Sequence, residues 1–308
     1  SLWATVAGGR SNSASANYAG VGGGRNNRGM ETYAWVGGGF QNRVDDSYAL
    51  VVGGYRNTAQ NMYTAILGGR DNFAAEPYTV VNAGYQNTAS GFASVIGGGY
   101  QCTVSALYDV LGGGRLNFID STYSAIGGGG FNSILTHGGS VIPGGMNNSV
   151  IGQYSNVGGG YENKAADVAI VISGGYQNTA DAEYSSIGGG RQNVATSNYA
   201  RIGGGQMNSN GGIRSFIGGG WDNRITALSS VVGGGEKNNA TSSYATISGG
   251  RYNVVQDSYG AIGGGRSNKI LGSSAVIGGG SWNFASEDYI SIAGGHSNTA
   301  SGLYAAVG

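Results

Sequence analysis

The chain has 308 residues, of which 64 are Gly and 2 are Pro, and its 16 basic side chains balance its 16 acidic ones. This charge balance provides no positive field for nucleic acid or an anionic membrane surface, so we expect neither as a partner. Glycine is too abundant for an ordinary globular domain, and proline is too scarce for collagen.

Few side chains in the sequence are of the types that catalyse reactions or bind metals. Cys102 is the single cysteine, which excludes an internal disulfide and every cysteine-cluster metal site. His137 and His296 lie far apart in sequence, and neither has a repeated or paired acidic context. We therefore expect no catalytic residue, no cofactor and no metal, and we predict that the protein is not an enzyme.

No run of 18 apolar residues occurs, so no insertion into a membrane is expected. The chain begins at Ser1 without the apolar segment of a secretion signal, and we expect a mature form or a fragment.

One unit of 15 residues repeats along the whole chain. It reads aliphatic-Gly-Gly-Gly-x-x-Asn-x-Ala-x-x-x-Tyr-Ala-x, and its aliphatic position is filled in all 21 occurrences, from Val6 to Val307. A fixed period of this kind is typical of solenoids, in which each coil must fit the coils above and below it. The sequence predicts an all-β fold, a parallel β-solenoid of about 20 coils that forms a single domain over residues 1–308.

Three consecutive glycines open most of the coils. Glycine permits positive φ and close approach of backbones, so the triplet either forms a tight corner or accommodates a neighbouring strand or chain. It is not a phosphate-binding loop, because no Gly-Lys-Ser/Thr follows and no helix is signalled.

The position after the glycines holds Arg or an aromatic residue in 14 of 20 coils. Aromatic faces and guanidinium groups suit sugars and anionic groups, so one interpretation is an extended surface-binding stripe. The other interpretation is stacking between coils, and the two are compatible. The residues of this predicted stripe are Arg10, Arg25, Phe40, Tyr55, Arg70, Tyr85, Tyr100, Arg115, Tyr161, Tyr176, Arg191, Trp221, Arg251 and Arg266.

An asparagine follows two residues later in 19 of 20 coils, and Cys102 is the exception. We expect a buried ladder in which each side-chain amide bonds the same amide one coil away and the backbone of its own turn. Cys102 is then a small buried substitute.

The end of each coil, as in residues 184–187, alternates in the manner of a strand. The aliphatic and the small residue are expected to point inward, together with the small or aliphatic residue two positions after Asn. The variable residue and the tyrosine are expected to point outward. Of the 20 tyrosines, 14 occupy this position, and stacked rings would stabilise the sheet.

The period changes once, because Ile126 and Ile142 are 16 residues apart. This one-residue insertion between residues 127 and 142 predicts a bulge or a lengthened turn around residues 137–139. The core of each coil contains only one aliphatic and two small residues, which favours further burial between chains. We therefore expect a homo-oligomer, and a trimer is favoured.

The segments Tyr-Ser-Asn-Val-Gly-Gly-Gly-Tyr-Glu-Asn at 154–163 and Ala-Ser-Val-Ile-Gly-Gly-Gly-Tyr-Gln at 93–101 resemble the head repeats of trimeric autotransporter adhesins (YadA-like heads) and related phage tail-fibre proteins. The resemblance covers essentially the whole chain. It implies a left-handed parallel β-roll, three chains side by side, and an attachment role on a cell surface or virion. The coils of those heads are about one residue shorter.

The leading functional hypothesis is a non-catalytic structural or adhesive rod of an extracellular adhesin or fibre, which binds a glycan or another surface ligand. One alternative is an ice-binding solenoid, although the slot after Asn forms no regular threonine array. A passive extracellular filament or spacer is the other alternative.

Overall fold

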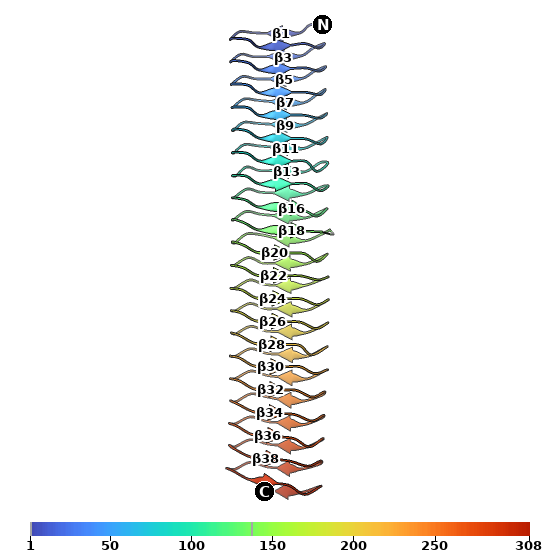
Figure 1. Ribbon diagram of the computed structural model, residues 1–308, viewed down its shortest axis with the longest axis vertical. Helices are drawn as coiled ribbons and strands as arrows, with labels where there is room; N and C mark the ends of the chain where they lie inside the picture. Colours follow the sequence, from blue (N-terminus) through green and yellow to red (C-terminus); the bar gives the residue numbers. More distant parts are fainter. Residues whose placement is uncertain (1, 137) are drawn as a thin grey trace. The chain divides into compact units, whose positions relative to one another are not determined.

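A computed structural model describes residues 2–136 and 138–308 of the chain. Over these residues the backbone forms strands, turns and bends, with no helix. They group into two compact units, Ser1–Tyr154 and Ser155–Gly308. Within each unit, parallel strands stack coil upon coil as a β-solenoid (Figure 1), which confirms the predicted fold class. The single domain over residues 1–308 and the left-handed winding stay predictions.

The first unit contains two ladders of short parallel strands. The first ladder consists of β1 (Thr5–Val6), β3 (Gly20–Val21), β5 (Trp35–Val36), β7 (Leu50–Val51), β9 (Ala65–Ile66), β11 (Val80–Val81), β13 (Val95–Ile96), β15 (Val110–Leu111), β17 (Ala125–Ile126) and β19 (Val141–Ile142). The second consists of β2 (Ser13–Ala14), β4 (Arg28–Gly29), β6 (Arg43–Val44), β8 (Thr58–Ala59), β10 (Phe73–Ala74), β12 (Thr88–Ala89), β14 (Thr103–Val104), β16 (Phe118–Asp120), β18 (Ser133–Leu135) and β20 (Ser149–Val150).

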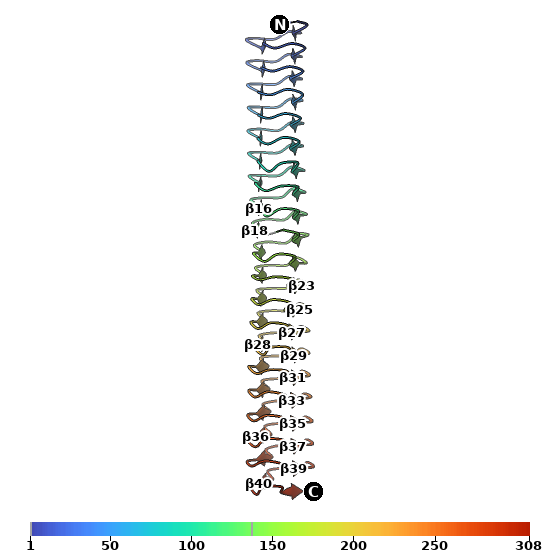
Figure 2. The same ribbon diagram turned by 90° about the vertical axis from the view of Figure 1, so that its right-hand side faces the viewer.

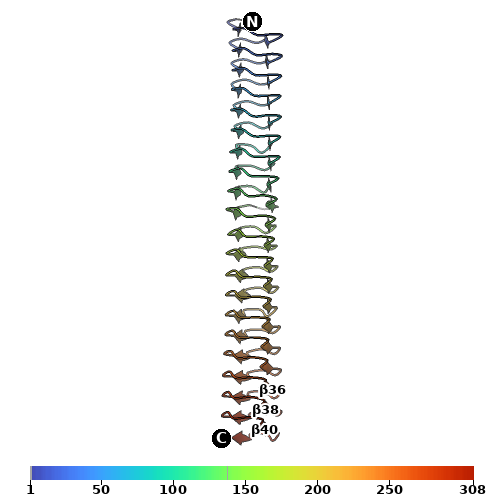
Figure 3. The same ribbon diagram turned by 90° about the vertical axis from the view of Figure 1, so that its left-hand side faces the viewer.

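The second unit repeats this arrangement. Its first ladder consists of β21 (Asn156–Val157), β23 (Val171–Ile172), β25 (Ser186–Ile187), β27 (Arg201–Ile202), β29 (Phe216–Ile217), β31 (Val231–Val232), β33 (Thr246–Ile247), β35 (Ala261–Ile262), β37 (Val276–Ile277), β39 (Ser291–Ile292) and β41 (Ala306–Val307). Its second ladder consists of β22 (Lys164–Ala165), β24 (Thr179–Ala180), β26 (Val194–Ala195), β28 (Ser209–Asn210), β30 (Arg224–Ile225), β32 (Asn239–Ala240), β34 (Val254–Val255), β36 (Lys269–Ile270), β38 (Phe284–Ala285) and β40 (Thr299–Ala300). Figures 2 and 3 show, for each unit, the two ladders on opposite sides of the coils.

The inward side chains of the two ladders form the core. The aliphatic residue of every first-ladder strand from β3 to β39 is buried, as Ile187 and Ile217 are, and so is the facing residue of every second-ladder strand from β4 on, such as Ala195 or Ile225. The small residue before the first-ladder strand is also buried, as at Ala200. The predicted inward positions are therefore confirmed, whereas the prediction of two small residues per coil holds only in part, because the second-ladder position is Val or Ile in eight coils.

The tyrosine position differs from the prediction of a strand that begins at this residue. Tyr184 and Tyr199 have φ of 57° and 60°, which places them in left-handed corners before the two-residue strands. Left-handed backbone costs about 1–2 kcal/mol for a residue with a side chain. Ring stacking offsets this cost, since the ring centroids of Tyr184 and Tyr199 lie 5.0 Å apart with the ring planes 6° from parallel.

The asparagine ladder is present and buried, and Asn223 in the second unit illustrates its bonds. Its backbone N–H donates to Oδ1 of Asn208 in the preceding coil at 3.0 Å. Its Nδ2 donates to the carbonyl of Gly219 in its own turn at 2.9 Å and to that of Gly235 in the next coil at 2.8 Å. Nδ2 also lies 3.1 Å from Oδ1 of Asn208. Each amide therefore satisfies its own corner and links three successive coils.

Cys102 interrupts the ladder in the first unit. Its backbone N–H still donates to Oδ1 of Asn87 at 3.0 Å. Its Sγ lies 3.5 Å from the carbonyl of Gly114, where an asparagine would supply an N–H donor. Burial raises the pKa of the Cys102 thiol, which disfavours the reactive thiolate. Cys102 is thus a buried substitute, as predicted from the sequence.

The three positions of the glycine corner have different roles, and residues 218–220 illustrate them. Gly220 has φ of +92°, and a Cβ there would overlap the carbonyl oxygen of Gly235 in the next coil. A Cβ on Gly218 would overlap the carbonyl of Gly233 in the same way, whereas a Cβ on Gly219 would come no nearer than 3.9 Å to Gly204 O. The third position, which is glycine in every corner, therefore permits coil-to-coil contact, whereas the first position also accepts residues such as Val52 and Ser173 and the middle glycine faces open space.

The register change lies where the sequence placed it. β16 pairs with β18 at a spacing of 15 residues, whereas β17 pairs with β19 at a spacing of 16, so the extra residue falls between β18 and β19. The backbone N–H groups of Thr136 and Gly139 donate to Asp120 O and Thr122 O in the preceding coil at 3.2 and 3.0 Å. This is a lengthened turn, as expected, although His137 itself lies outside the described residues.

Asp109 is a buried acid at a position where most other coils carry Ala, Ser, Thr or Gly and two carry Ile. Its Oδ1 accepts the backbone N–H of Ser124 at 2.8 Å, and its Oδ2 has no partner among the described residues. Burial raises the pKa of Asp109 to about 7, the bond from Ser124 opposes that shift, and the charge of Asp120 adds to it. The folded chain therefore holds a proton on Asp109 that an unfolded chain releases near pH 4.

We predict that Gly220→Ala destabilises the second unit strongly, whereas Gly219→Ala does not. The first change adds the left-handed penalty of about 1–2 kcal/mol and an overlap with the next coil. Urea unfolding followed by circular dichroism measures both variants. Equal losses at the two positions would contradict the assigned corner geometry.

We predict that Asp109→Ser stabilises the chain at pH 8 and leaves its stability nearly unchanged at pH 4. Between about pH 4 and 7 the folded state binds more protons than the unfolded state, so the free energy of unfolding falls as pH rises, by at most about 1.4 kcal/mol per pH unit. Serine occupies the same position at Ser94, Ser124 and Ser140, and the Ser124 hydroxyl accepts the next coil's N–H. Urea midpoints of wild type and variant, measured from pH 4 to 8, isolate this contribution. A difference between the two proteins that does not grow with pH would refute it.

Candidate functional site

The fourteen predicted stripe residues lie at one structural position, directly after the glycine corner, where successive coils form isolated parallel bridges. We call this set the Arg/aromatic column. In the first unit it is unbroken over eight coils, which carry Arg10, Arg25, Phe40, Tyr55, Arg70, Tyr85, Tyr100 and Arg115. In the second unit Gln206 and Glu236 interrupt it, and it comprises Tyr161, Tyr176, Arg191, Trp221, Arg251 and Arg266.

Column residues contact one another from coil to coil. Phe40 stacks on Tyr55 with ring centroids 5.2 Å apart, and Tyr161 stacks on Tyr176 at 5.3 Å. The guanidinium of Arg70 lies between two rings, 5.0 Å from the centroid of Tyr55 and 5.4 Å from that of Tyr85. Such cation–π contacts contribute about 0.5–1 kcal/mol each at exposed sites. Stacking between coils is therefore present in the column.

Carboxylates neutralise part of the column. Asp71 accepts ion pairs from Arg56 at 2.9 Å and Arg70 at 3.2 Å, and Glu236 pairs with Arg251 at 3.1 Å. Arg251 also donates to the hydroxyl of Tyr252 at 3.3 Å, and this bond raises the pKa of Arg251. These arginines are held by neighbours, which lowers their freedom to meet a ligand.

The column nevertheless remains accessible. Tyr100 is 43% exposed, and Arg25 and Arg191 are exposed although each also contacts a ring. In the part of the chain that the structure describes, Arg266 has neither a ring contact nor an ion pair. The column is thus a ladder of self-contacts whose outer edges face solvent, and its binding role stays a prediction.

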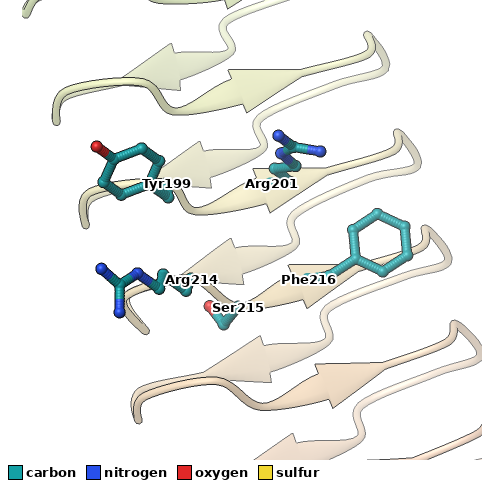
Figure 4. Close-up of a pocket in the computed structure, with 5 residues that line it drawn as sticks. All are labelled: Tyr199, Arg201, Arg214, Ser215 and Phe216. Carbon is teal, nitrogen blue, oxygen red and sulfur yellow. The ribbon is translucent and has the colours of Figure 1, made fainter.

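A second site, which the sequence analysis did not identify, lies in the second unit on the outer face of β27 and β29. It is a hollow lined by Tyr199, Arg201, Arg214, Ser215 and Phe216 (Figure 4), and we call it the two-arginine hollow. Arg201 and Phe216 are paired on neighbouring strands. Arg214 takes the tyrosine position of its coil and lies 5.9 Å from the ring centroid of Tyr199.

A sequence signal for this hollow existed. Arg201 and Phe216 occupy the variable outward strand position, and Arg214 occupies a position that is Tyr in 14 coils. Two arginines on adjacent coils, each replacing a less polar residue common at its position, were the available clue.

The described residues show no other arrangement typical of a chemical site. No group of three or more His, Cys, Asp or Glu side chains is placed to hold a metal within residues 2–136 and 138–308. His296 Nδ1 is 2.8 Å from the hydroxyl of Ser281. The described parts of the chain contain no helix that is long and apolar enough to cross a bilayer.

No known family model matches the sequence, and a search of curated proteins gave no match.

We predict that Arg70→Ser lowers the free energy of unfolding by about 1–2 kcal/mol, because it removes two cation–π contacts and the ion pair to Asp71. Arg266→Ser is the matched control and is expected to change stability by less than about 0.5 kcal/mol. Urea unfolding measures both. If the two variants lose the same stability, the ring contacts do not stabilise the column.

Proposed function

We propose that the chain is a non-catalytic structural and adhesive segment of an extracellular adhesin or fibre, and that its Arg/aromatic column contacts a glycan or another surface ligand. One observation carries the proposal. The inward polar side chains of nearly every coil hold the backbone, whereas an exposed outward column of Arg and aromatic residues runs over eight consecutive coils of the first unit.

The non-catalytic part rests on how the polar groups are used. The buried asparagines are committed to backbone donors and acceptors, as Asn223 is, and so cannot move protons to a substrate. The histidine described, His296, lies near the chain end beside Ser281 rather than beside a carboxylate.

The adhesive part rests on the chemistry of the column. Aromatic faces pack against the apolar faces of sugar rings, and guanidinium groups donate to hydroxyl and anionic oxygens. A column that repeats this pair of groups coil after coil offers many weak contacts to a repetitive surface, and multivalency strengthens such binding without any single deep pocket.

Self-association of the chain as a homo-oligomer, with a trimer favoured, is part of the proposal. The outer face of the first ladder in the first unit carries apolar side chains in successive coils. Trp35 is 47% and Val110 is 50% exposed, and Leu50, Val80 and Val95 lie between them. A contiguous exposed apolar strip of this kind favours burial against another chain.

No observation favours the ice-binding alternative. The outward position of the second ladder holds Thr58, Phe73, Thr88, Thr103 and Phe118 in successive coils, so bulky rings interrupt the threonines. A passive spacer is a possible outcome of the experiment below.

The test compares wild type with the triple variant Arg25→Ser, Arg70→Ser, Arg115→Ser, which removes three cations from the unbroken part of the column, on a glycan array and on cell surfaces. We expect wild type to bind and the triple variant to bind at least 10-fold more weakly, while circular dichroism keeps its β-type spectrum. Sedimentation equilibrium of the same preparation is expected to give the mass of a trimer. Absence of wild-type binding would leave a passive spacer, and unchanged binding by the triple variant would restrict these arginines to stacking.

A further inference from the structure

We propose that the two-arginine hollow binds an acidic saccharide unit, a pyranose ring that carries a carboxylate or a sulfate group. The inference rests on the proposed function, since it names a ligand class for an adhesive segment. It places that ligand in the second unit on the first ladder, at residues separate from the Arg/aromatic column.

The hollow brings two cations and two rings to one face. Figure 4 shows Tyr199 and Arg214 one coil apart at the corner before the strands, and Arg201 and Phe216 one coil apart on β27 and β29. Successive coils are separated by the ordinary strand spacing of about 4.8 Å. One cation and one ring therefore lie at each end of the hollow, with Tyr199 and Arg214 at one end and Arg201 and Phe216 at the other, so an acidic saccharide of more than one ring would contact both ends.

Neither guanidinium has an anionic partner. Among the described residues, the ion pairs join Arg43, Arg56, Arg70 and Arg251 to carboxylates, and Arg201 and Arg214 take part in none of them. Both side chains are exposed. Arginine forms bidentate bonds to carboxylate and other oxyanions, so an anionic group at either end of the hollow would meet a guanidinium without an ionic partner among the described residues.

The rings provide the second half of the recognition. Tyr199 is 43% and Phe216 is 41% exposed. An exposed ring of this size offers a flat apolar surface against which the C–H face of a pyranose can pack. A small inorganic anion would use the arginines alone, so the aromatic pair favours a ligand that has both a charge and a ring.

A buried asparagine, at a position where the repeat has an apolar residue or glycine, hydrogen-bonds to the backbone beneath the hollow. Asn210 is fully buried and takes an inward position that in every other coil is Ala, Val, Ile or Gly. Its Nδ2 donates to the carbonyl of Arg201 at 2.9 Å and to that of Ser215 at 3.1 Å. Its Oδ1 accepts from the Gly212 N–H at 3.3 Å and from the hydroxyl of Ser215.

This buried amide links the two coils that carry the hollow. A polar group in a core lowers stability unless its hydrogen bonds are made, and here they are made to the backbone of Arg201 and Ser215. Gly212 keeps the same corner compact, because a Cβ there would overlap the Ala227 carbonyl. The hollow is therefore held in a fixed geometry, which reduces the ordering required when a ligand binds.

A smaller depression continues the hollow along the same face. Val171, Ser186, Arg201 and Phe216 line it, so the two depressions meet at Arg201 and Phe216. The small side chain of Ser186 leaves room beside Arg201. The surface thus suits an oligosaccharide that extends across several coils rather than an isolated monosaccharide.

An acidic saccharide fits better than a nucleic acid strand. A strand requires a series of cations along its phosphates, whereas the chain has no net charge and this face presents two arginines. A single-stranded oligonucleotide therefore serves as a competing probe in the test.

The test titrates the full chain, by isothermal calorimetry, with oligogalacturonate, with a dextran sulfate oligosaccharide, with neutral dextran and with a single-stranded oligonucleotide. We expect at least one acidic saccharide to bind at least 10-fold more tightly than neutral dextran and the oligonucleotide. The two acidic probes separate a carboxylate ligand from a sulfate ligand. Equal binding of neutral dextran, or binding of the oligonucleotide alone, would overturn the inference.

Two variants test whether the acidic saccharide binds in the hollow. Arg214→Tyr restores the residue that 14 other coils carry at that position, and Arg201→Ser introduces the residue present at Ser186. Each is expected to weaken acidic-saccharide binding at least 10-fold with an unchanged circular dichroism spectrum. Arg224→Ser removes one exposed charge from the other ladder of the same unit and is expected to leave affinity unchanged. Full affinity in Arg214→Tyr and Arg201→Ser would refute the site.

The outcomes distinguish this inference from the proposed function. If cells bind wild type and the Arg214→Tyr variant equally while acidic saccharides fail to bind, adhesion stands and the hollow is not a ligand site. If the saccharide binds in the hollow but wild type attaches to no cell or array surface, the hollow stands as a saccharide site and the adhesive function fails.

Discussion

The asparagine amide is the interaction on which the rest of the structure depends. In nearly every coil it accepts the next coil's backbone N–H and donates to one carbonyl of its own corner and one of the following coil, as at Asn208 and Asn223. A two-residue strand makes too few backbone bonds to fix a coil alone. The buried amide supplies hydrogen-bond partners to the backbone N–H and C=O groups of the corner. These groups are buried away from water and would otherwise be unsatisfied.

This bond pattern explains why the glycines surround the asparagine. The amide reaches the next coil only if the corners approach closely, and at Gly220 a side chain would occupy the space that the carbonyl of Gly235 and the amide of Asn223 fill. The glycine corner, the asparagine ladder and the strand register therefore depend on one another and form a single constraint. It also explains how one extra residue between β18 and β19 is tolerated, since it lengthens a turn at the tyrosine corner and leaves the bonds of Asn132 and Asn148 intact.

Residues that depart from the repeat give single coils properties that the other coils do not have. Cys102 removes an amide, Asp109 introduces a buried proton that titrates near neutral pH, and Asn210 turns a core position into a support for two coils. The outward face shows the same contrast. Arg70 is held by rings and a carboxylate, whereas Arg201 and Arg214 are left without an anionic partner among the described residues. Recognition is expected where side chains are not already used to hold the coils.

The sequence by itself determined the coil length, the inward aliphatic and asparagine positions, the outward Arg/aromatic column and the site of the insertion, because a stacked repeat imposes the same environment on the same position in every coil. Only the tertiary structure decided that Tyr199 lies in a left-handed corner rather than in a strand, and that Asn223 also donates to the carbonyl of Gly235 in the next coil. The two-arginine hollow also required coordinates. Its residues come from two coils, and Asn210 supports it through backbone carbonyls, which have no signature in the sequence. Repetition is visible along a chain, whereas contacts that depend on backbone direction and on the neighbouring coil exist only once the coils are stacked.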